Sequence, residues 1–212
     1  MKSVDPPKLE VDLPPQLLKD ALDEDRFVVK CSIRDEQLTE VSHERIVFDQ
    51  VLFEGVSFEE LSFDRVEFVD CRFTRCDFSN TDFGDAIFRR VEIMNSKMVG
   101  SNFSECHMKD VRIEDCLANY ANFNFSTIQS ALFKEVAFKN ADFYEVKMKD
   151  IKYDHCNLDE GNFAETELNG IDFSTSTYEN ITFTVEKLKG SIVSEQQALR
   201  IVQSLGLIIK EE

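Results

Sequence analysis

A five-residue period runs through most of this chain and limits what it can fold into. From Phe48 to Leu188, every fifth residue is Phe, Ile, Leu, Met or Tyr, with Ala118 as the one small exception. Seventeen of the 19 phenylalanines fall in this phase, and Phe27 and Phe125 are the two that do not. Small side chains occupy most positions two residues before each centre, so the pattern provides two inward-facing sets.

The period excludes an ordinary helix or strand, because a helix repeats every 3.6 residues and a strand every 2. The chain must instead turn every five residues, and the 29 units from Ile46 to Gly190 follow one another without interruption. Such a chain buries both sets by coiling, with neighbouring coils joined through backbone hydrogen bonds. This is a solenoid, in which each repeat contacts only its neighbours.

A second pattern appears when every fourth unit is compared. Every fourth centre forms an unbroken phenylalanine column, while the other three columns are mixed; the column is Phe63, Phe83, Phe103, Phe123, Phe143, Phe163 and Phe183. Four units per coil therefore fit the sequence, and stacked coils would place these rings about 4.8 Å apart. We call the outward residues of these seven units the Phe face.

The repeat resembles the A(D/N)LXX pattern of the pentapeptide-repeat family, as in the segments CDFSN, TDFGD, SNFSE and ADFYE. The resemblance implies an all-β fold, a right-handed quadrilateral β-helix, with a short C-terminal helix added here. We expect residues 1–25 to form an N-terminal extension and cap. Residues 26–190 would form the β-helix, regular from 46 after a degenerate first coil, and residues 191–212 a C-terminal helix and dimerisation tail.

The carboxyl end departs from the repeat and carries helix signals. Ser194 and Gln197 have capping-box spacing, apolar residues follow at helical intervals, and Gly206 is the expected C-cap. The apolar tail beyond it favours pairing with a second copy of the chain. We expect a homodimer through Tyr178, Ile192, Ile201, Leu205, Leu207 and Ile208.

Composition narrows the possible partners. The first residues lack a secretory apolar core, and no segment has the apolar length of a membrane span, so we expect a soluble, cytoplasmic protein. The 41 acidic and 24 basic residues give a net charge of −17. This charge argues against binding nucleic acid or an anionic membrane and favours a basic partner.

Catalytic and metal-binding signals are missing from the sequence. Five of the six cysteines fall in the small inward phase, and there is no CxxC pair, which favours packing over metal binding or disulfides. The chain has no glycine-rich phosphate loop, nucleophile elbow or HExxH motif. We therefore expect no enzyme activity, no metal and no cofactor.

Charge on the outer surface is unevenly distributed. The four sides carry sums near +1, −2, −4 and −6, and the Phe face is the most acidic, with seven acids against Arg65. The −4 side, centred on the column from Phe58 to Tyr178, adjoins it; we call it the flanking face. The candidate partner-binding residues on these two faces are Glu59, Asp77, Asp82, Asp85, Glu105, Asp142, Glu145, Asp159, Glu160 and Glu165.

Two interpretations of the acidic surface formed by the Phe face and the flanking face stay open. The acids could simply keep the rod soluble. Alternatively, carboxylates about 4.8 Å apart along a rod could imitate the phosphates of duplex DNA, which lie ~3.4 Å apart per strand.

The chain most resembles the quinolone-resistance (Qnr-like) group of Gram-positive type, through the segment EDCLANYANFNF and the ending from IDFSTSTYENITF onward. The resemblance implies a DNA mimic that binds DNA gyrase or topoisomerase IV, modulates its activity and reduces fluoroquinolone susceptibility. Whether it protects or inhibits the enzyme stays open, as does the preferred topoisomerase. The alternative is a non-catalytic β-helical scaffold for another cellular protein, suggested by the outward-facing Tyr120, Phe125 and Tyr144.

Overall fold

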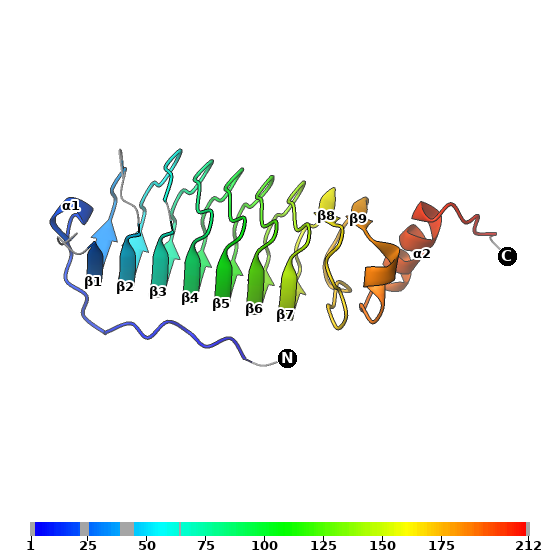
Figure 1. Ribbon diagram of the computed structural model, residues 1–212, viewed down its shortest axis with the longest axis horizontal. Helices are drawn as coiled ribbons and strands as arrows, with labels where there is room; N and C mark the ends of the chain where they lie inside the picture. Colours follow the sequence, from blue (N-terminus) through cyan, green and yellow to red (C-terminus); the bar gives the residue numbers. More distant parts are fainter. Residues whose placement is uncertain (1–2, 22–25, 39–44, 64, 211–212) are drawn as a thin grey trace.

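The protein is a straight rod of stacked coils with a helix at each end (Figure 1). The computed structural model describes residues 3–21, 26–38, 45–63 and 65–210. Within these ranges, seven parallel strands form one sheet in chain order. They are β1 (Phe27–Arg34), β2 (Val47–Glu54), β3 (Glu67–Thr74), β4 (Ile87–Met94), β5 (His107–Glu114), β6 (Thr127–Lys134) and β7 (Lys147–Asp154).

The register of the strands fixes four units per coil. Each strand pairs with the next at an offset of one coil, so that Phe48 lies opposite Phe68 and Phe68 opposite Phe88. Each of these strands spans two consecutive units, and we call this half of the surface the strand side. The other two units of each coil form the flanking face and the Phe face.

On the flanking face and the Phe face, successive coils share fewer β-bridges than on the strand side. Their coils are joined by single bridges, such as Ser57 to Asp77 and Ser62 to Asp82. Among the described residues of the Phe face, short strands lie near the carboxyl end, as β8 (Gly161–Phe163) and β9 (Ile181–Phe183). The predicted quadrilateral β-helix is confirmed, with continuous strands on one half of its perimeter and turns on the other.

The turns come from a left-handed residue at every fifth position. Each residue whose number is a multiple of five, from Arg45 to Gly170, has a positive φ. A Cβ atom disfavours this conformation in most L-residues, and glycine adopts it freely. Glycine nevertheless occupies only Gly55, Gly100 and Gly170 in this run. Tertiary stacking therefore imposes the left-handed conformation on the remaining side chains.

The core is a set of stacked rings. Along the all-Phe column, the centroids of successive rings lie 4.7 to 5.4 Å apart from Phe63 to Phe163. Rings in neighbouring columns meet edge to face, as in Phe68 and Phe73 at 5.1 Å and 80°. Both geometries suit the quadrupole of the aromatic ring. The predicted phenylalanine ladder is thus present.

The amino-terminal extension first runs along the strand side and then covers the first coil. The Gln16 amide donates to the Ser32 carbonyl and the Ser32 amide to the Pro14 carbonyl, both at 2.9 Å, so the extension pairs with the outer edge of β1. Leu18 in α1 (Leu18–Ala21) is buried against the core. Covering an edge strand in this way blocks its pairing with other chains.

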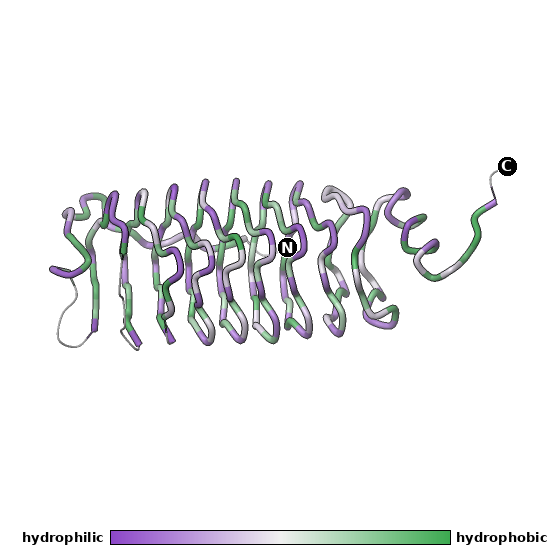
Figure 2. Tube along the Cα trace, turned by 90° about the horizontal axis from the view of Figure 1, so that it is seen from above, coloured by the Kyte–Doolittle hydropathy of each residue, from purple (hydrophilic) through white to green (hydrophobic). Residues whose placement is uncertain are grey.

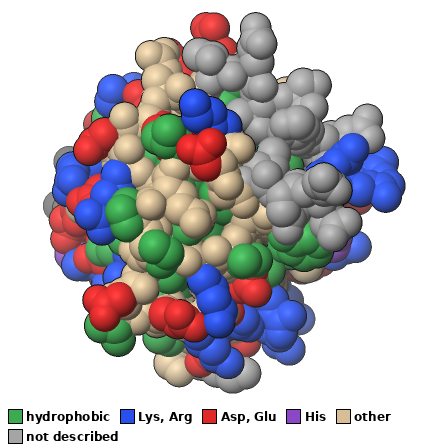
Figure 3. All heavy atoms as spheres, turned by 90° about the vertical axis from the view of Figure 1, so that its left-hand side faces the viewer, with side chains coloured by type: hydrophobic (Ala, Val, Ile, Leu, Met, Phe, Trp, Pro, Cys, Tyr) green, Lys and Arg blue, Asp and Glu red, His purple; other side chains and the backbone are tan. Residues whose placement is uncertain are grey.

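The extension also contacts the middle of the rod. The Lys8 amide donates to the Asp70 carboxylate at 2.9 Å. In the end-on view of Figure 3, hydrophobic side chains on this end lie among polar and charged ones. The sequence predicted an N-terminal extension and cap here but not its path along the sheet.

The carboxyl end is closed by a 3-10 helix (Val185–Leu188) and α2 (Glu195–Ser204). The predicted capping box is confirmed: the Gln197 amide donates to Ser194 Oγ, and the Ser194 amide donates to Gln197 Oε1. Gln197 Nε2 also donates to the Phe173 and Ser176 carbonyls, which joins the helix to the last regular coil.

The end of α2 differs from the prediction by one residue. Leu205 is the C-cap, and Gly206 follows it with a φ of 79°. The Gly206 amide donates to the Gln203 carbonyl and the Leu207 amide to the Val202 carbonyl, which is a Schellman ending. Beyond it the apolar tail projects away from the rod (Figure 2). No helix in the described ranges is long and apolar enough to cross a membrane.

Candidate functional site: the acidic faces

The candidate partner-binding acids all lie on the outer surface, on two adjacent faces. Seven of them are exposed, namely Glu59, Asp82, Asp85, Glu105, Glu145, Glu160 and Glu165. Asp77, Asp142 and Asp159 are half-buried. Asp64, which the sequence also assigns to the Phe face, lies outside the described residues.

One edge of the Phe face carries a row of side chains at the left-handed turn positions. In this row Asp85, Glu105, Glu145 and Glu165 share the same place in successive coils, with Phe125 between the second and third. Neighbouring members are one strand spacing apart, about 4.8 Å. None of the ion pairs between described residues includes these four carboxylates. We call Asp85, Glu105, Phe125, Glu145 and Glu165 the corner row.

The centre of the Phe face is a ladder of amides and carboxylates. Asn102 Nδ2 donates to Asp82 Oδ1 at 2.7 Å, and Asn122 Nδ2 donates to Asn102 Oδ1 at 3.0 Å. Farther along, Asn162 Nδ2 donates to Asp142 Oδ1 at 2.9 Å. These neutral donors fix the two carboxylates without cancelling their charge, so the face keeps its negative potential.

Two acids of the flanking face form ion pairs with lysines of neighbouring coils. Asp77 pairs with Lys97 at 3.1 Å, and Asp159 pairs with Lys139 at 3.4 Å. Burial acts to raise the pKa of Asp77, but hydrogen bonds from Ser79 and Lys97 outweigh it and hold that pKa below its ordinary value. Both carboxylates are already partnered, which leaves the Phe face as the main unpaired acidic surface.

The strand side balances its charges across coils. Arg72 Nε donates to Glu92 at 2.7 Å, and Arg90 Nε donates to Asp70 at 2.6 Å. Glu114 accepts from Lys134, whose hydrogen bond is the main cause that lowers the pKa of this carboxyl group. Among the described residues, the strand side thus compensates much of its charge across coils, and its two sides sum to near +1 and −2 against −6 for the Phe face.

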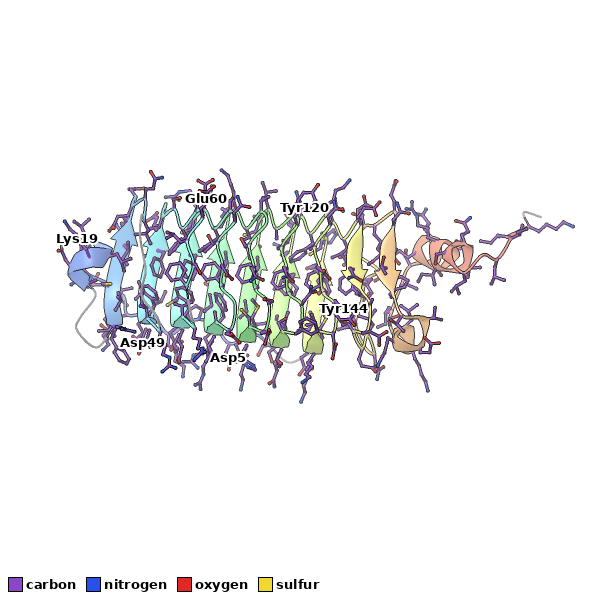
Figure 4. The ribbon with its side chains drawn as sticks, turned by 45° about the horizontal axis from the view of Figure 1, so that its top comes forward. Asp5, Lys19, Asp49, Glu60, Tyr120 and Tyr144 are labelled. Atoms are coloured by element: carbon purple, nitrogen blue, oxygen red, sulfur yellow. The ribbon has the colours of Figure 1, made fainter. Side chains whose placement is uncertain are left out.

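Exposed aromatic side chains interrupt the acidic faces in the middle of the rod. Tyr120 is 63% exposed and Phe125 is 52% exposed, and Figure 4 labels Tyr120 along the same long edge as Glu60. The rings of Phe125 and Tyr144 meet edge to face with centroids 5.6 Å apart. The sequence located these residues but did not connect Phe125 with the corner row.

The predicted dimerisation residues divide into exposed and buried ones. Ile192, Leu205, Leu207 and Ile208 are exposed, Ile208 at 96%. Ile201 is half-buried in α2. Tyr178 is only 6% exposed, and Arg200 in α2 donates to its carbonyl, so this residue does not belong to the exposed part of the surface. The dimer itself stays a prediction.

The cysteines behave as core residues. All six are buried and free of disulfides, and burial raises the pKa of Cys76, Cys116 and Cys156 to about 11. Thiols with such pKa values stay protonated near neutral pH and are poor nucleophiles and metal ligands. Among the described residues, no group of three or more His, Cys, Asp or Glu side chains could hold a metal ion.

Comparison with known proteins gives a family match within the coil. Residues 66–137 match the model of the pentapeptide repeat region. The chain is 45% identical over 124 residues to the uncharacterized protein YisX of Bacillus subtilis strain 168. That alignment covers 58% of this chain and 58% of YisX, so it spans less than two thirds of the relative.

The solved structures that match this chain are more distant in sequence. Full-length QnrB1, described as a plasmid-mediated fluoroquinolone resistance protein, is 12% identical with a TM-score of 0.42, over 85% of this chain and 99% of QnrB1. HetL, a pentapeptide repeat protein involved in heterocyst differentiation regulation in Nostoc sp. strain PCC 7120, is 12% identical with a TM-score of 0.39, over 78% and 86%. Residues 66–137 therefore form a pentapeptide repeat region, in keeping with the five-residue pattern and the four-unit coil.

Proposed function

We propose that this protein binds a type II topoisomerase, DNA gyrase or topoisomerase IV, at the enzyme's basic DNA-binding surface and modulates its activity. The observation that carries the proposal is the unpaired acid of the Phe face, set against the compensated charges of the strand side. Reduced susceptibility to fluoroquinolones would follow if the bound protein altered the drug-sensitive cleavage complex. This role requires a cytoplasmic location.

The charge of the Phe face and the flanking face supports the proposal that this surface imitates duplex DNA. Neighbouring positions of the corner row are about 4.8 Å apart, against ~3.4 Å for phosphates along one DNA strand, and carboxylates occupy all of its positions except that of Phe125. A basic groove shaped for DNA would meet fixed negative charge on the Phe face. The sequence resemblance to the quinolone-resistance group supplies the class of partner, and the surface supplies a physical reason for it.

A homodimer through the carboxyl ends would extend this surface. The tail after α2 exposes Leu205, Leu207 and Ile208, and a contiguous apolar surface of this kind is typical of a protein interface. Two copies joined there would place two rods end to end. The dimer is part of the proposal, and sedimentation of Leu207→Asp against the unchanged protein tests it.

The direct test measures gyrase supercoiling and fluoroquinolone-induced DNA cleavage with increasing amounts of the protein. The decisive variant neutralises the acids of the corner row: Asp85→Asn, Glu105→Gln, Glu145→Gln and Glu165→Gln. A matched control neutralises four acids of the strand side: Glu67→Gln, Asp115→Asn, Glu135→Gln and Asp150→Asn. Both variants change the net charge equally.

We expect the corner-row variant to lose most of its effect on both assays and the control to keep it. The effect of the unchanged protein should also weaken as salt rises, because salt screens exposed charges. No change in either assay at micromolar protein would reject the proposal. Equal losses in the two variants would show that net charge, and not the Phe face, determines binding.

A non-catalytic scaffold for another cellular protein is the second candidate, favoured by the exposed Leu117 and Tyr120 on the flanking face. Affinity capture from the host separates the two. Recovery of a different partner with no topoisomerase subunit, repeated after Tyr120→Ser as a control for the aromatic surface, would favour the scaffold.

A further inference from the structure

The left-handed turn positions follow a strict rule of composition with two exceptions. From Arg45 to Gly170, these positions hold charged or polar residues or glycine, apart from Tyr120 and Phe125. Such residues suit the site because they tolerate solvent, and Gly, Asn and Asp also tolerate a positive φ. Two large aromatic side chains at these corners need a separate explanation.

Phe125 suits neither the solvent exposure nor the positive φ of its position. Its φ is 61°, a conformation that is unusual for a bulky residue, and its side chain is 52% exposed. It is also one of only two phenylalanines outside the core phase of the repeat. A residue that meets no local need of the fold points to a use at the surface.

The surroundings of Phe125 give it a specific chemistry. In the corner row it stands between Glu105 and Glu145, one coil to either side. Tyr144 packs edge to face against its ring, and the Phe125 amide donates to the Tyr144 carbonyl at 3.0 Å. The Tyr144 amide in turn donates to Asn124 Oδ1 at 2.9 Å. The two rings thus contact each other at the position of the corner row that lies between Glu105 and Glu145, neither of which forms an ion pair with a described residue.

We propose that Phe125 and Tyr144 form a docking site for an arginine side chain of a basic partner protein. A guanidinium group stacks on aromatic faces and also donates paired hydrogen bonds to carboxylates, so it fits rings flanked by acids. Lysine would gain the charge attraction but lacks the planar group. Exposed aromatic anchors ringed by polar residues are typical of interface hot spots.

This inference rests on the proposed binding of a basic partner through the Phe face. It adds a contact that charge alone does not provide, because stacking on a ring is screened less by salt than attraction between exposed charges. Mimicry by charge alone would give arginine and lysine equal preference. The two ideas can therefore be separated by experiment.

The experiment compares blocked tetra-arginine and tetra-lysine peptides by calorimetric titration of the full chain. We expect the arginine peptide to bind about three- to fivefold more tightly, in keeping with an exposed cation–π contact. The variant Phe125→Asn with Tyr144→Ser should lose this preference and keep the affinity for the lysine peptide. Tyr120→Ser, which removes the other exposed aromatic residue at a left-handed turn position, on the flanking face, is the matched control.

Equal affinities of the two peptides for the unchanged protein would overturn the inference. So would a preference that survives in the double variant, or one that Tyr120→Ser removes equally. Circular dichroism melting shows whether each variant keeps its fold, and the lysine peptide provides an internal check on the acidic surface.

The outcome is distinct from that of the proposed function. If the chain prefers the arginine peptide through Phe125 and Tyr144 but has no effect on gyrase, the topoisomerase proposal fails and the docking site stands. If gyrase responds to the protein and the peptides bind alike, the docking site fails and the topoisomerase proposal stands.

Discussion

The strand side and the Phe face are built from the same five-residue unit, but their charged side chains differ in whether they form ion pairs. On the strand side, carboxylates and cations pair across coils, as in Arg90 with Asp70 and Arg72 with Glu92. On the Phe face, neutral amides donate to Asp82 and Asp142. Glu105 and Glu145 lie in the corner row without an ion pair to a described residue.

The difference shows that the coil does not require the acidic excess. Both halves have a left-handed residue at every fifth position and the same kind of ring-stacked interior, and the strand side stacks although most of its charge is compensated. Like charges at strand spacing repel one another. The acid of the Phe face therefore opposes stability slightly and supports a binding role, which changes to either half can test.

The largest expected effect comes from the interior, where the two halves should respond alike. Phe103→Ala, in the ladder beneath the Phe face, should lower the free energy of unfolding by about 3–5 kcal/mol, because it removes a buried ring and leaves a cavity. Phe133→Ala, beneath the strand side, should cost a similar amount. Urea denaturation measures both, and a much smaller loss for Phe103→Ala would mean that the ladder is not tightly packed.

The next largest effect is a loss of stability that should differ between the two halves, because, among the described residues, only the strand side has a buried ion pair to lose. Arg90→Ala should lower the free energy of unfolding by about 2 kcal/mol at neutral pH, because it leaves the buried Asp70 carboxylate without its cation. The Arg90 and Asp70 side chains are 15% and 7% exposed. Glu105→Ala on the Phe face removes no such partner and should leave stability unchanged or slightly higher. A large loss there would contradict the contrast between the halves.

The contribution of this pair should depend on pH. Burial acts to raise the pKa of Asp70, but hydrogen bonds from Arg90 and the Lys8 amide outweigh it and hold the pKa below its ordinary value. The stabilisation is therefore complete above the ordinary carboxyl pKa of about 3.9 and disappears as the pH falls through the lower folded value. The difference between the unchanged protein and Arg90→Ala should shrink in acid, as measured by urea denaturation at neutral and low pH.

A smaller effect concerns the turn positions. Phe125→Asn should raise the free energy of unfolding by about 1 kcal/mol, because asparagine tolerates the left-handed conformation better than phenylalanine. Gly100→Ala should lower it by about 1–2 kcal/mol, because its new Cβ would have a positive φ. That atom would also lie 2.6 Å from Asn80 Oδ1. Thermal melting follows both, and a destabilised Phe125→Asn would mean that the ring contributes to folding.

The smallest effect is that of salt. Moving from low to high ionic strength should raise the free energy of unfolding by a few tenths of a kcal/mol, about the size of exposed charge interactions, because it screens repulsion on the Phe face. The corner-row variant should lose this salt dependence and the strand-side control should keep it. Salt titrations of urea denaturation compare them, and identical slopes would show that repulsion is spread over the whole rod.

The sequence predicted the coil more completely than the site. It could count acids on each face but not see that Lys97 and Lys139 reach Asp77 and Asp159, because such pairs depend on side-chain reach across coils. It assigned Tyr178 to the dimer surface, yet that ring turns inward beneath α2. The path of the extension past Asp70 also depends on contacts between residues far apart in the chain.

Periodicity by itself determined the four-sided coil, the phenylalanine ladder and the buried cysteines, because one apolar residue in every five can be buried only if the chain turns at that interval. Only the tertiary structure decided which acids stay unpaired and which aromatic residue stands among them. Those properties arise from contacts between coils 20 residues apart. A count along the sequence gives the face of each residue, whereas its partners across coils determine the charge that the face presents.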